Sequence, residues 1–332
     1  MKIDGKPPRI NLTEIAVISL IGRIAPPLTR GSAYRLGQDG GLRVLPGSGG
    51  ITLSHRIGDR CVGLAADHLE PAVSFRAVDQ GVESTKGAAN RALNVLACVG
   101  NKVEIVSGPA TGTLGVVTGK HGGVANVMAD FPVKAMRRLR IGDMIRVTSC
   151  GQGMRLRDFD QVTVMNASPD LLTRWGVLVR GGRLSVPVTH MVPSALMGSG
   201  LGKSSAARGD YDIQLFDDDI VRRFRLASLR FGDMVAIMDA AGRFGRSFMR
   251  GQVTVGVVVH SDSTVAGHGP GVTTLLAGPV NEIAVEHDPE ANLAKILEIR
   301  RLARPKIERT FVRRTPHLAP VGSIRSGRRL ST

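Results

Sequence analysis

Two histidines and an aspartate lie within nine residues of one another, in the glycine-rich segment from His260 to His268. The apolar run Val253 to Val259 precedes them and predicts a buried strand. Loops that follow strands often hold reactive side chains, because the strand fixes the point at which the loop begins. We therefore expect this loop, with His260, Asp262 and His268, to form part of a functional site.

A second loop of similar composition lies far upstream, at 67–70, where a histidine and two carboxylates occur within four residues. Neutral imidazole together with carboxylate is the donor set that proteins use for Zn²⁺, Mn²⁺ or Fe²⁺. We predict that both loops share one site, which either holds a divalent metal or is an acid–base site built from His, Asp and Glu. The predicted metal ligands are His68, His260 and His268, and the predicted ligand or general base is Glu70 or Asp262.

Two further histidines, His121 and His190, also lie in predicted turns at strand ends. We expect them to orient a substrate or to complete the coordination shell of the metal. The chain contains no H-E-x-x-H motif, so the prediction rests on residue type and position rather than on a metal-binding signature.

Cys98 is a second candidate for chemistry. Asn90, Asn94 and Cys98 are spaced at i, i+4 and i+8 in the predicted helix 84–98, so they form one polar stripe that faces a cleft. A thiolate nucleophile needs a nearby base, and the sequence identifies none, so we predict a structural Cys98. The three cysteines lie far apart without metal-binding spacing, which favours a reduced, cytoplasmic setting.

The glycine-rich segment 198–204 resembles a phosphate loop but has Met197 where that motif requires glycine. An anion-contacting loop that uses Lys203 is the alternative left open. A group of aspartates follows it and lacks the regular spacing of a calcium loop, so we interpret it as a solvated acidic face. The members of this group are Asp210, Asp212, Asp217, Asp218 and Asp219.

The fold class predicted from 41 glycines and many short apolar runs is α+β and β-rich, with small β-barrel-like modules and a few flanking helices. The clearest module lies near 103–147. Gly-Asp turns precede the strands, and Leu139 to Ile145 is echoed by Leu229 to Val235, with a weaker copy at Arg56 to Arg60. This echo indicates either two related modules or convergent turn chemistry.

We predict an N-terminal β-rich domain over 1–150, a second β-rich domain over 151–287, a helix over 288–304 and a flexible basic tail over 305–332. Asp288 is expected to cap that helix and Pro289 to open it. The segment 300–332 carries ten Lys or Arg against one acid, and so holds nine of the sixteen excess positive charges.

Composition also limits the partners of the protein. Nucleic-acid contact is expected to be weak and tail-mediated at most, because aromatic residues are only 4% of the chain, too few for a stacking platform. The apolar run Ile15 to Ile21 is too short to span a bilayer, so no membrane contact is expected. A small-molecule substrate fits the predicted site, and a homo-oligomer is compatible with the composition.

Several strings resemble a bacterial and archaeal family, domain-of-unknown-function family four-four-three-eight. The strings are Asp67-His68-Leu69-Glu70-Pro71, Asn90-Arg91-Ala92-Leu93-Asn94, Val117-Thr118-Gly119-Lys120-His121-Gly122-Gly123, Pro187-Val188-Thr189-His190, His260-Ser261-Asp262-Ser263 and Gly267-His268-Gly269-Pro270-Gly271. The resemblance spans roughly 10–285. It implies that this body is one unit to which the basic tail is added, and it carries over no catalytic residue.

Two functions are therefore in view. The favoured one is a hydrolase or lyase that acts on a small molecule through a metal or an acid–base pair. The alternative is a non-enzymatic binding module, because 103–119 resembles the SH3-like barrel of RNA-associated proteins and the basic tail would contact RNA or an acidic partner. Metal content is the property that separates these two classes.

Overall fold

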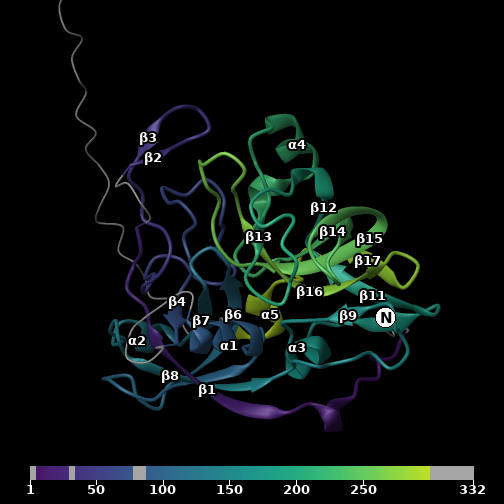
Figure 1. Cartoon of the computed structure of the whole chain (residues 1–332), viewed down its shortest axis with the longest axis horizontal. Coiled ribbons are helices and arrows are strands. Elements are labelled where there is room, and N and C mark those ends of the chain that lie inside the picture. The colour runs from purple at the N-terminus through teal and green to yellow at the C-terminus, as the bar shows by residue number, and fades with distance from the viewer. Residues whose placement is uncertain (1–4, 30–33, 78–86, 300–332) are drawn as a thin grey trace, which may run out of the picture.

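The structure is a computed structural model that describes residues 5–29, 34–77 and 87–299. It is β-rich with a few short helices, as the sequence predicts (Figure 1). The basic tail at 305–332 lies outside the described residues. The division into domains at residue 150 stays a prediction.

Six antiparallel strands close into a barrel in the order β1-β4-β7-β6-β5-β8. This confirms the small barrel expected near 103–147, which β1 and β4 complete from outside that range. Alternate residues of its strands, such as Val103 with Ile105 and Ile145 with Val147, are fully buried in its core. The bounds are β1 Val17–Ile24, β4 Val73–Arg76, β5 Lys102–Ile105, β6 Leu114–His121, β7 Asn126–Asp130 and β8 Met144–Cys150.

A six-stranded sheet lies beside the barrel, with β12, β14, β15, β16 and β13 in that order and β9 paired to β16. Its central strand β15 includes residues 253–258 of the apolar run predicted at 253–259, and Val253, Val255 and Val257 are fully buried. The bounds are β9 Thr163–Val164, β12 His190–Pro193, β13 Tyr211–Asp212, β14 Met234–Ala241, β15 Ser247–Val258 and β16 Gly271–Pro279.

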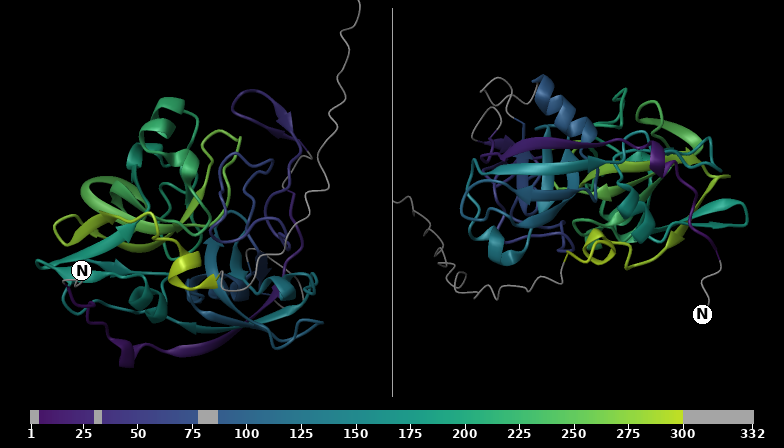
Figure 2. Two further views of the ribbon diagram at one scale, coloured as in Figure 1. Left: turned by 180° about the vertical axis from the view of Figure 1, so that it is seen from behind. Right: turned by 90° about the horizontal axis from the view of Figure 1, so that it is seen from below.

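Two smaller sheets and the helices flank these layers (Figures 1 and 2). The three-stranded sheet contains β10 Leu178–Arg180, β11 Arg183–Val188 and β17 Ile283–His287, and the two-stranded one contains β2 Arg35–Leu36 and β3 Leu42–Arg43. The helices are α1 Ala88–Leu96, α2 Val133–Met136, α3 Pro169–Arg174, α4 Asp218–Arg223 and α5 Leu293–Ile296, with single 3-10 turns at Leu12–Glu14, Ser194–Leu196 and Leu226–Ser228. Among the described residues, no helix is long and apolar enough to cross a membrane.

The prediction for the last helix was wrong at its start. Asp288 does not cap it, and Pro289 does not open it: Asn292 is the N-cap of α5 and accepts a hydrogen bond from the Ala294 N–H. The Asp288 carboxylate instead accepts from the Glu290 N–H, which closes a local turn. Asp–Pro is equally suited to a turn and to a helix start, and here the turn forms.

The barrel and the six-stranded sheet are joined where β6 ends against β16. The Thr273 hydroxyl accepts a hydrogen bond from the Lys120 N–H at 3.2 Å and donates to the Lys120 carbonyl at 2.9 Å. This contact places His121, the next residue after Lys120, beside the sheet that carries the His260 loop. The junction of the two sheets therefore brings the predicted loops together.

Candidate metal centre

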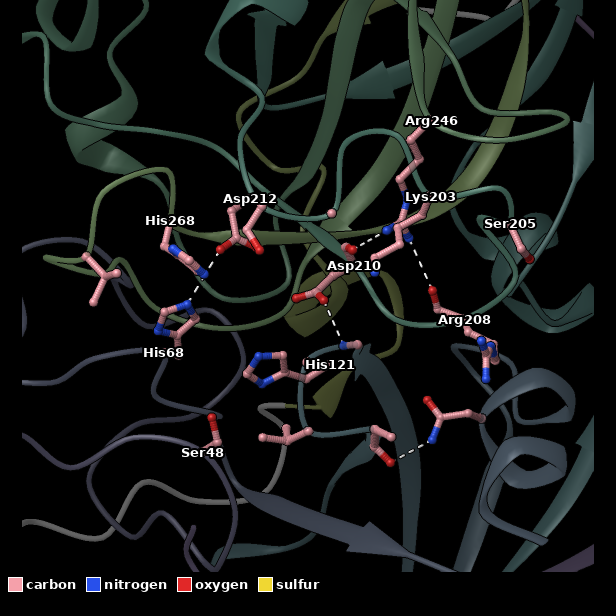
Figure 3. Close-up of a pocket in the computed structure, with 18 of the residues that line it drawn as sticks. Ser48, His68, His121, Lys203, Ser205, Arg208, Asp210, Asp212, Arg246 and His268 are labelled. Atoms are coloured by element: carbon pink, nitrogen blue, oxygen red, sulfur yellow. Dashed lines mark hydrogen bonds and ion pairs between the residues drawn. The ribbon is translucent and has the colours of Figure 1, made fainter. Parts of the chain in front are cut away.

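A cavity of about 990 Å³ lies at this junction, lined by residues of both sheets (Figure 3). His68, His121 and His268 line it, and His260 lies behind them, fully buried. His68 precedes β4, His121 ends β6, and the other two stand in the loop between β15 and β16. Segments far apart in the sequence thus supply one histidine cluster.

The rings of this cluster are close enough to contact a common ligand. Ring centroids are 4.3 Å apart for His121 and His260, 5.0 Å for His68 and His260, and 5.0 Å for His68 and His268. The predicted convergence of His68, His260 and His268 is confirmed, and His121 joins them. His68 has a backbone φ of 56°. Such a left-handed conformation is uncommon for a residue with a Cβ and is often found at functional sites.

All four histidines have the same hydrogen-bond arrangement. In each ring, Nδ1 contacts a carboxylate or carbonyl oxygen, which has no proton to give, so Nδ1 is the donor and Nε2 is left for another partner. Metal-binding histidines are oriented in this way by a second layer of acceptors. The acceptors are Asp67 for His68 at 2.8 Å, Glu70 for His121 at 2.6 Å, the Ser261 carbonyl for His260 at 2.9 Å and the Ala266 carbonyl for His268 at 3.0 Å.

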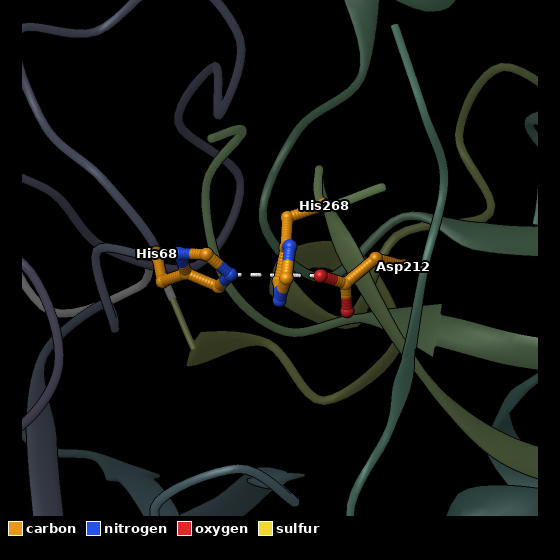
Figure 4. Close-up of side chains that lie close together, drawn as sticks. All are labelled: His68, Asp212 and His268. Atoms are coloured by element: carbon orange, nitrogen blue, oxygen red, sulfur yellow. Dashed lines mark ion pairs between the residues drawn. The ribbon is translucent and has the colours of Figure 1, made fainter. Parts of the chain in front are cut away.

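Two aspartates complete the cluster. Asp210 Oδ2 lies 2.7 Å from His260 Nε2, yet neither atom has a hydrogen-bond partner. Asp212 Oδ2 lies 3.5 Å from His68 Nε2 (Figure 4). The residues form two groups, each with ligand atoms within 4.8 Å of one another. They are His121 with Asp210 and His260, and His68 with Asp212 and His268.

The interpretation of these aspartates as a solvated face was wrong for two of the five. Asp210 and Asp212 are only 7% and 4% exposed. Residues two apart on an extended backbone point to the same side. Asp210, directly before β13, and Asp212, within it, therefore both direct their carboxylates into the cavity. Asp217 to Asp219 are exposed, as expected, and Asp217 caps α4. The polar–apolar–polar order of Asp210-Tyr211-Asp212 is the one local sign of this difference, and it is too short to identify a buried strand from the sequence.

Glu70 lies behind His121 rather than in the cavity. Its buried carboxylate accepts hydrogen bonds from His121, from the Ser74 hydroxyl at 2.5 Å, from Asn126 and from the Gly49 N–H. Burial alone would raise the pKa of Glu70, but the hydrogen bond and charge of His121, with those from Ser74 and Asn126, lower it overall. Glu70 is therefore an ionised partner that fixes the ring of His121.

Two predicted site residues do not join the cluster. His190 lies on β12, where its ring contacts Thr189 and Ser228. The Asp262 carboxylate accepts from the Gly63 N–H, and its carbonyl accepts from the His68 N–H at 3.1 Å, so Asp262 holds the His68 loop in place. Neither residue is among those that line the cavity.

His260 and Asp210 form a buried pair in which each side chain shifts the pKa of the other. Burial lowers the pKa of His260, but the Asp210 and Asp212 carboxylates outweigh this effect and raise it to about 9. Burial raises the pKa of Asp210, but the charges of His121 and His260 hold it well below its usual range. Without a metal, the pair therefore carries both charges, and a positive charge between these side chains is favoured.

The part of the cavity on the other side of Asp210 from His68 and His268 is cationic (Figure 3). The Lys203 and Arg208 side chains line it and are exposed. Arg246 is buried there, packs over the Tyr211 ring at 4.8 Å and donates to the Arg208 carbonyl at 3.2 Å. Lys203 belongs to the glycine-rich loop for which an anion contact was left open. This part of the cavity can hold the anionic group of a ligand.

Cys98 is buried, and burial raises the pKa of its thiol to about 11. Its Sγ contacts the Leu96 carbonyl at 3.6 Å. Cys98 lies two residues past α1, which ends at Leu96 rather than at the predicted residue 98. On α1, Asn90 and Asn94 line the cavity and both donate to the Ala125 carbonyl. A thiol with so high a pKa is protonated at neutral pH, which agrees with a structural Cys98.

The fold and the site define a β-rich protein with a histidine–aspartate cluster in the cavity between a barrel and a second sheet. Two family models match the chain: Domain of unknown function (DUF4438), N-terminal, over residues 34–173, and Domain of unknown function (DUF4438), C-terminal, over residues 174–297. The chain belongs to this family, as the sequence strings predicted.

The chain is also similar to a solved crystal structure, that of TM1086. The two share 39% sequence identity and superpose with a TM-score of 0.81, over 87% of this chain and 99% of that one. No curated protein matches the chain.

Proposed function

We propose that the protein is a divalent-metal-dependent enzyme with hydrolase or lyase chemistry on a small, anionic molecule. The observation that carries this proposal is the shared arrangement of the four histidines. Each Nδ1 is committed to an oxygen acceptor, and the Nε2 atoms of His68 and His260 lie beside the carboxylates of Asp212 and Asp210. This pattern is typical of rings held ready for a metal ion.

His121, His260 and Asp210 fit a cation best. They offer two imidazoles and one carboxylate, a donor set that suits Zn²⁺, Mn²⁺ or Fe²⁺ and leaves coordination positions open. His260 Nε2 and Asp210 Oδ2 are buried 2.7 Å apart without a hydrogen bond between them. Without a metal, a charged His260 supplies the positive charge that this contact needs. A bound divalent cation would replace the Nε2 proton and supply that charge instead.

The backbone is shaped around this pair. A Cβ on Gly271 would lie 2.1 Å from Asp210 Oδ2 and 2.2 Å from His260 Nε2, so only glycine fits there. Glu70 holds His121 from behind. A bound divalent cation would polarise a carbonyl or phosphoryl group of the substrate and lower the pKa of a water molecule. The protein's own residues fix the donors and exclude bulk water from His260.

The cavity supports the choice of substrate class. A volume of about 990 Å³ lies within the range of small-molecule sites, about 300–1,000 Å³. Lys203 and Arg208 would hold an anionic group of the substrate while its reacting group lies at the histidine cluster. Their charges favour a substrate that carries phosphate or carboxylate.

The direct test is the metal content of the purified protein and of the chelator-treated protein titrated with Zn²⁺, Mn²⁺ or Fe²⁺. We expect the wild type to bind one of these ions and to melt at a higher temperature with it. His260→Ala and Asp210→Asn should lose the ion at the His121 group and most of that shift. His190→Ala is the matched control, because that histidine lies outside the cavity lining, and it should bind metal like the wild type. Absence of binding in the wild type would contradict the proposal.

A further inference from the structure

The second group of possible ligands lies directly beside the first and shares a carboxylate with it. Asp212 Oδ2 lies 3.5 Å from His68 Nε2, and Asp212 Oδ1 lies 3.7 Å from His260 Nε2. The two oxygens of one side chain therefore point toward histidines of the two different groups. A carboxylate placed in this way can bridge two cations.

We propose that the cavity holds a two-metal centre in which Asp212 bridges the cations. His121, His260 and Asp210 bind the first ion, and His68 and His268 bind the second. This inference rests on the proposed function, because it adds a second ion to the same site.

The spacing of the histidines agrees with a pair of ions. Two-metal sites hold their ions about 3.5–4 Å apart. Neighbouring rings of the two groups are separated by 5.0 Å for His68 and His260 and by 5.8 Å for His68 and His121, which stack in parallel. Rings this close can direct their Nε2 atoms to two adjacent positions on either side of Asp212.

The second group is prepared in the same way as the first. His68 donates from Nδ1 to Asp67, whose other oxygen accepts from Arg35 at 2.7 Å. His268 donates from Nδ1 to the Ala266 carbonyl. A single ion at the first group would leave both Nε2 atoms without a cation.

The competing role for His68 is that of a general base oriented by Asp67. That role accounts for His68 but not for His268, whose ring lies 5.0 Å from it and faces the same carboxylate. The two-metal centre accounts for both rings. It also explains why one Asp212 oxygen lies near His68 and the other near His260.

Two adjacent ions also narrow the substrate class. A pair of cations can hold two oxygens of one group, as in the displacement reactions of phosphoryl compounds. Together with Lys203 and Arg208, this favours a substrate with a phosphoryl or carboxyl group at the ions and a further anionic group at the cationic part of the cavity.

The test counts Mn²⁺ ions by calorimetry and records their electron paramagnetic resonance in the full chain. We expect two Mn²⁺ per chain with an exchange-coupled spectrum in the wild type. His268→Ala should bind one Mn²⁺ with an uncoupled spectrum, and His190→Ala should behave like the wild type. His268 is partly exposed, so this variant is expected to fold. Asp212→Asn, which conserves shape, should lose the coupling even if His268→Ala fails to fold.

The outcomes separate this inference from the function on which it rests. One Mn²⁺ per wild-type chain, unchanged in His268→Ala, overturns the two-metal centre and leaves the metal enzyme standing. Two Mn²⁺ without coupling overturns the bridging role of Asp212. No Mn²⁺, Zn²⁺ or Fe²⁺ bound at all overturns both proposals.

Discussion

At the scale of single residues, the site depends on which ring nitrogen each histidine presents. Glu70 determines this for His121, because its ionised carboxylate accepts the Nδ1 proton at 2.6 Å. Sequence reasoning selected Glu70 as a ligand or base, and the structure places it behind the histidine. The residue type indicated a role at the site. Glu70 acts through His121, however, and that histidine belongs to β6, a strand that begins more than forty residues later.

Glu70→Gln tests this arrangement with almost no change in shape. The amide introduced by this substitution would present a donor to the Ser74 hydroxyl or the Gly49 N–H and would remove the charge behind His121. We expect metal affinity to fall by about 10–100-fold, as for other changes behind metal ligands. Titration calorimetry with Zn²⁺ would measure it. Glu104→Gln, at the exposed ion pair with Arg146, is the matched control and should bind Zn²⁺ normally. Unchanged affinity in Glu70→Gln would show that Glu70 only fills space.

The histidines were predictable from the sequence, and the aspartates were not. His68, His260 and His268 lie in loops with carboxylates and glycine, so residue type alone marks them. Asp210 and Asp212 resembled the acidic residues that follow, because β13 has only two residues and shows no periodicity. Their burial depends on pairing with β16, which is a long-range contact that local spacing does not reveal.

At the scale of elements, the repeated turn is the feature that the sequence predicted best. Asp59, Asp143 and Asp233 each accept a hydrogen bond from the backbone N–H three residues earlier. The preceding glycines, Gly58, Gly142 and Gly232, all have positive φ. The second copy opens β8 of the closed barrel, and the third opens β14 of the six-stranded sheet. The copies therefore share turn chemistry, although the sheets that they enter differ.

Two substitutions in these turns should differ in cost. Gly142→Ala, at φ +94° with nothing near its Cβ, should destabilise the protein by about 1–2 kcal/mol through backbone strain alone. Gly232→Ala, at φ +84°, adds a contact of 2.6 Å with the buried Ile57 side chain and should cost more. Urea unfolding would compare the two. Equal costs would show that Ile57 moves aside, and neither change should alter metal binding.

Helix ends show where local rules succeed and where they fail. The start of α3 follows the local rules: Pro169 is its first residue, and the Ser168 hydroxyl accepts from the Leu171 N–H. Asp288-Pro289 has the same appearance but forms a turn, because the cap of α5 is Asn292, whose side chain also donates to the Phe231 carbonyl and to Asp233. That cap is set by contacts with a distant turn, so it was not predictable from its neighbours.

At the scale of the whole molecule, the barrel and the six-stranded sheet each contribute different residues to the cavity. The barrel supplies His68 and His121, and the six-stranded sheet supplies the aspartates with His260 and His268. The cationic residues Lys203 and Arg208 belong to the loop before β13. A ligand that fills the cavity would therefore contact both sheets. In the proposed enzyme, this places the anionic group of the substrate apart from its reacting group.

The cationic part of the cavity predicts phosphate binding. For the metal-loaded protein, the double change Lys203→Ala with Arg208→Ala should weaken pyrophosphate binding by about 10-fold, because each charge-assisted contact is worth about 1.5–3 kcal/mol before solvent screening. Calorimetry at fixed ionic strength would measure it. The double change Arg222→Ala with Arg223→Ala on α4 removes as much charge away from the cavity lining and should have little effect. Equal weakening in both pairs would mean that only net charge matters.

The basic segment after residue 299 bears on the alternative function, that of an RNA-binding module. This segment carries nine of the sixteen excess positive charges, and the whole chain has only one Trp and two Tyr. Any binding to single-stranded RNA should therefore depend on charge, weaken steeply as salt rises, and largely disappear when the chain ends at Ile299. Titration of labelled RNA at two salt concentrations would measure this for both chains. Tight, salt-resistant binding by the shorter chain would instead assign RNA recognition to the body of the protein, with the six-stranded barrel as the expected module. It would count against the enzyme, because a stacking or base-reading surface would then exist on the body itself.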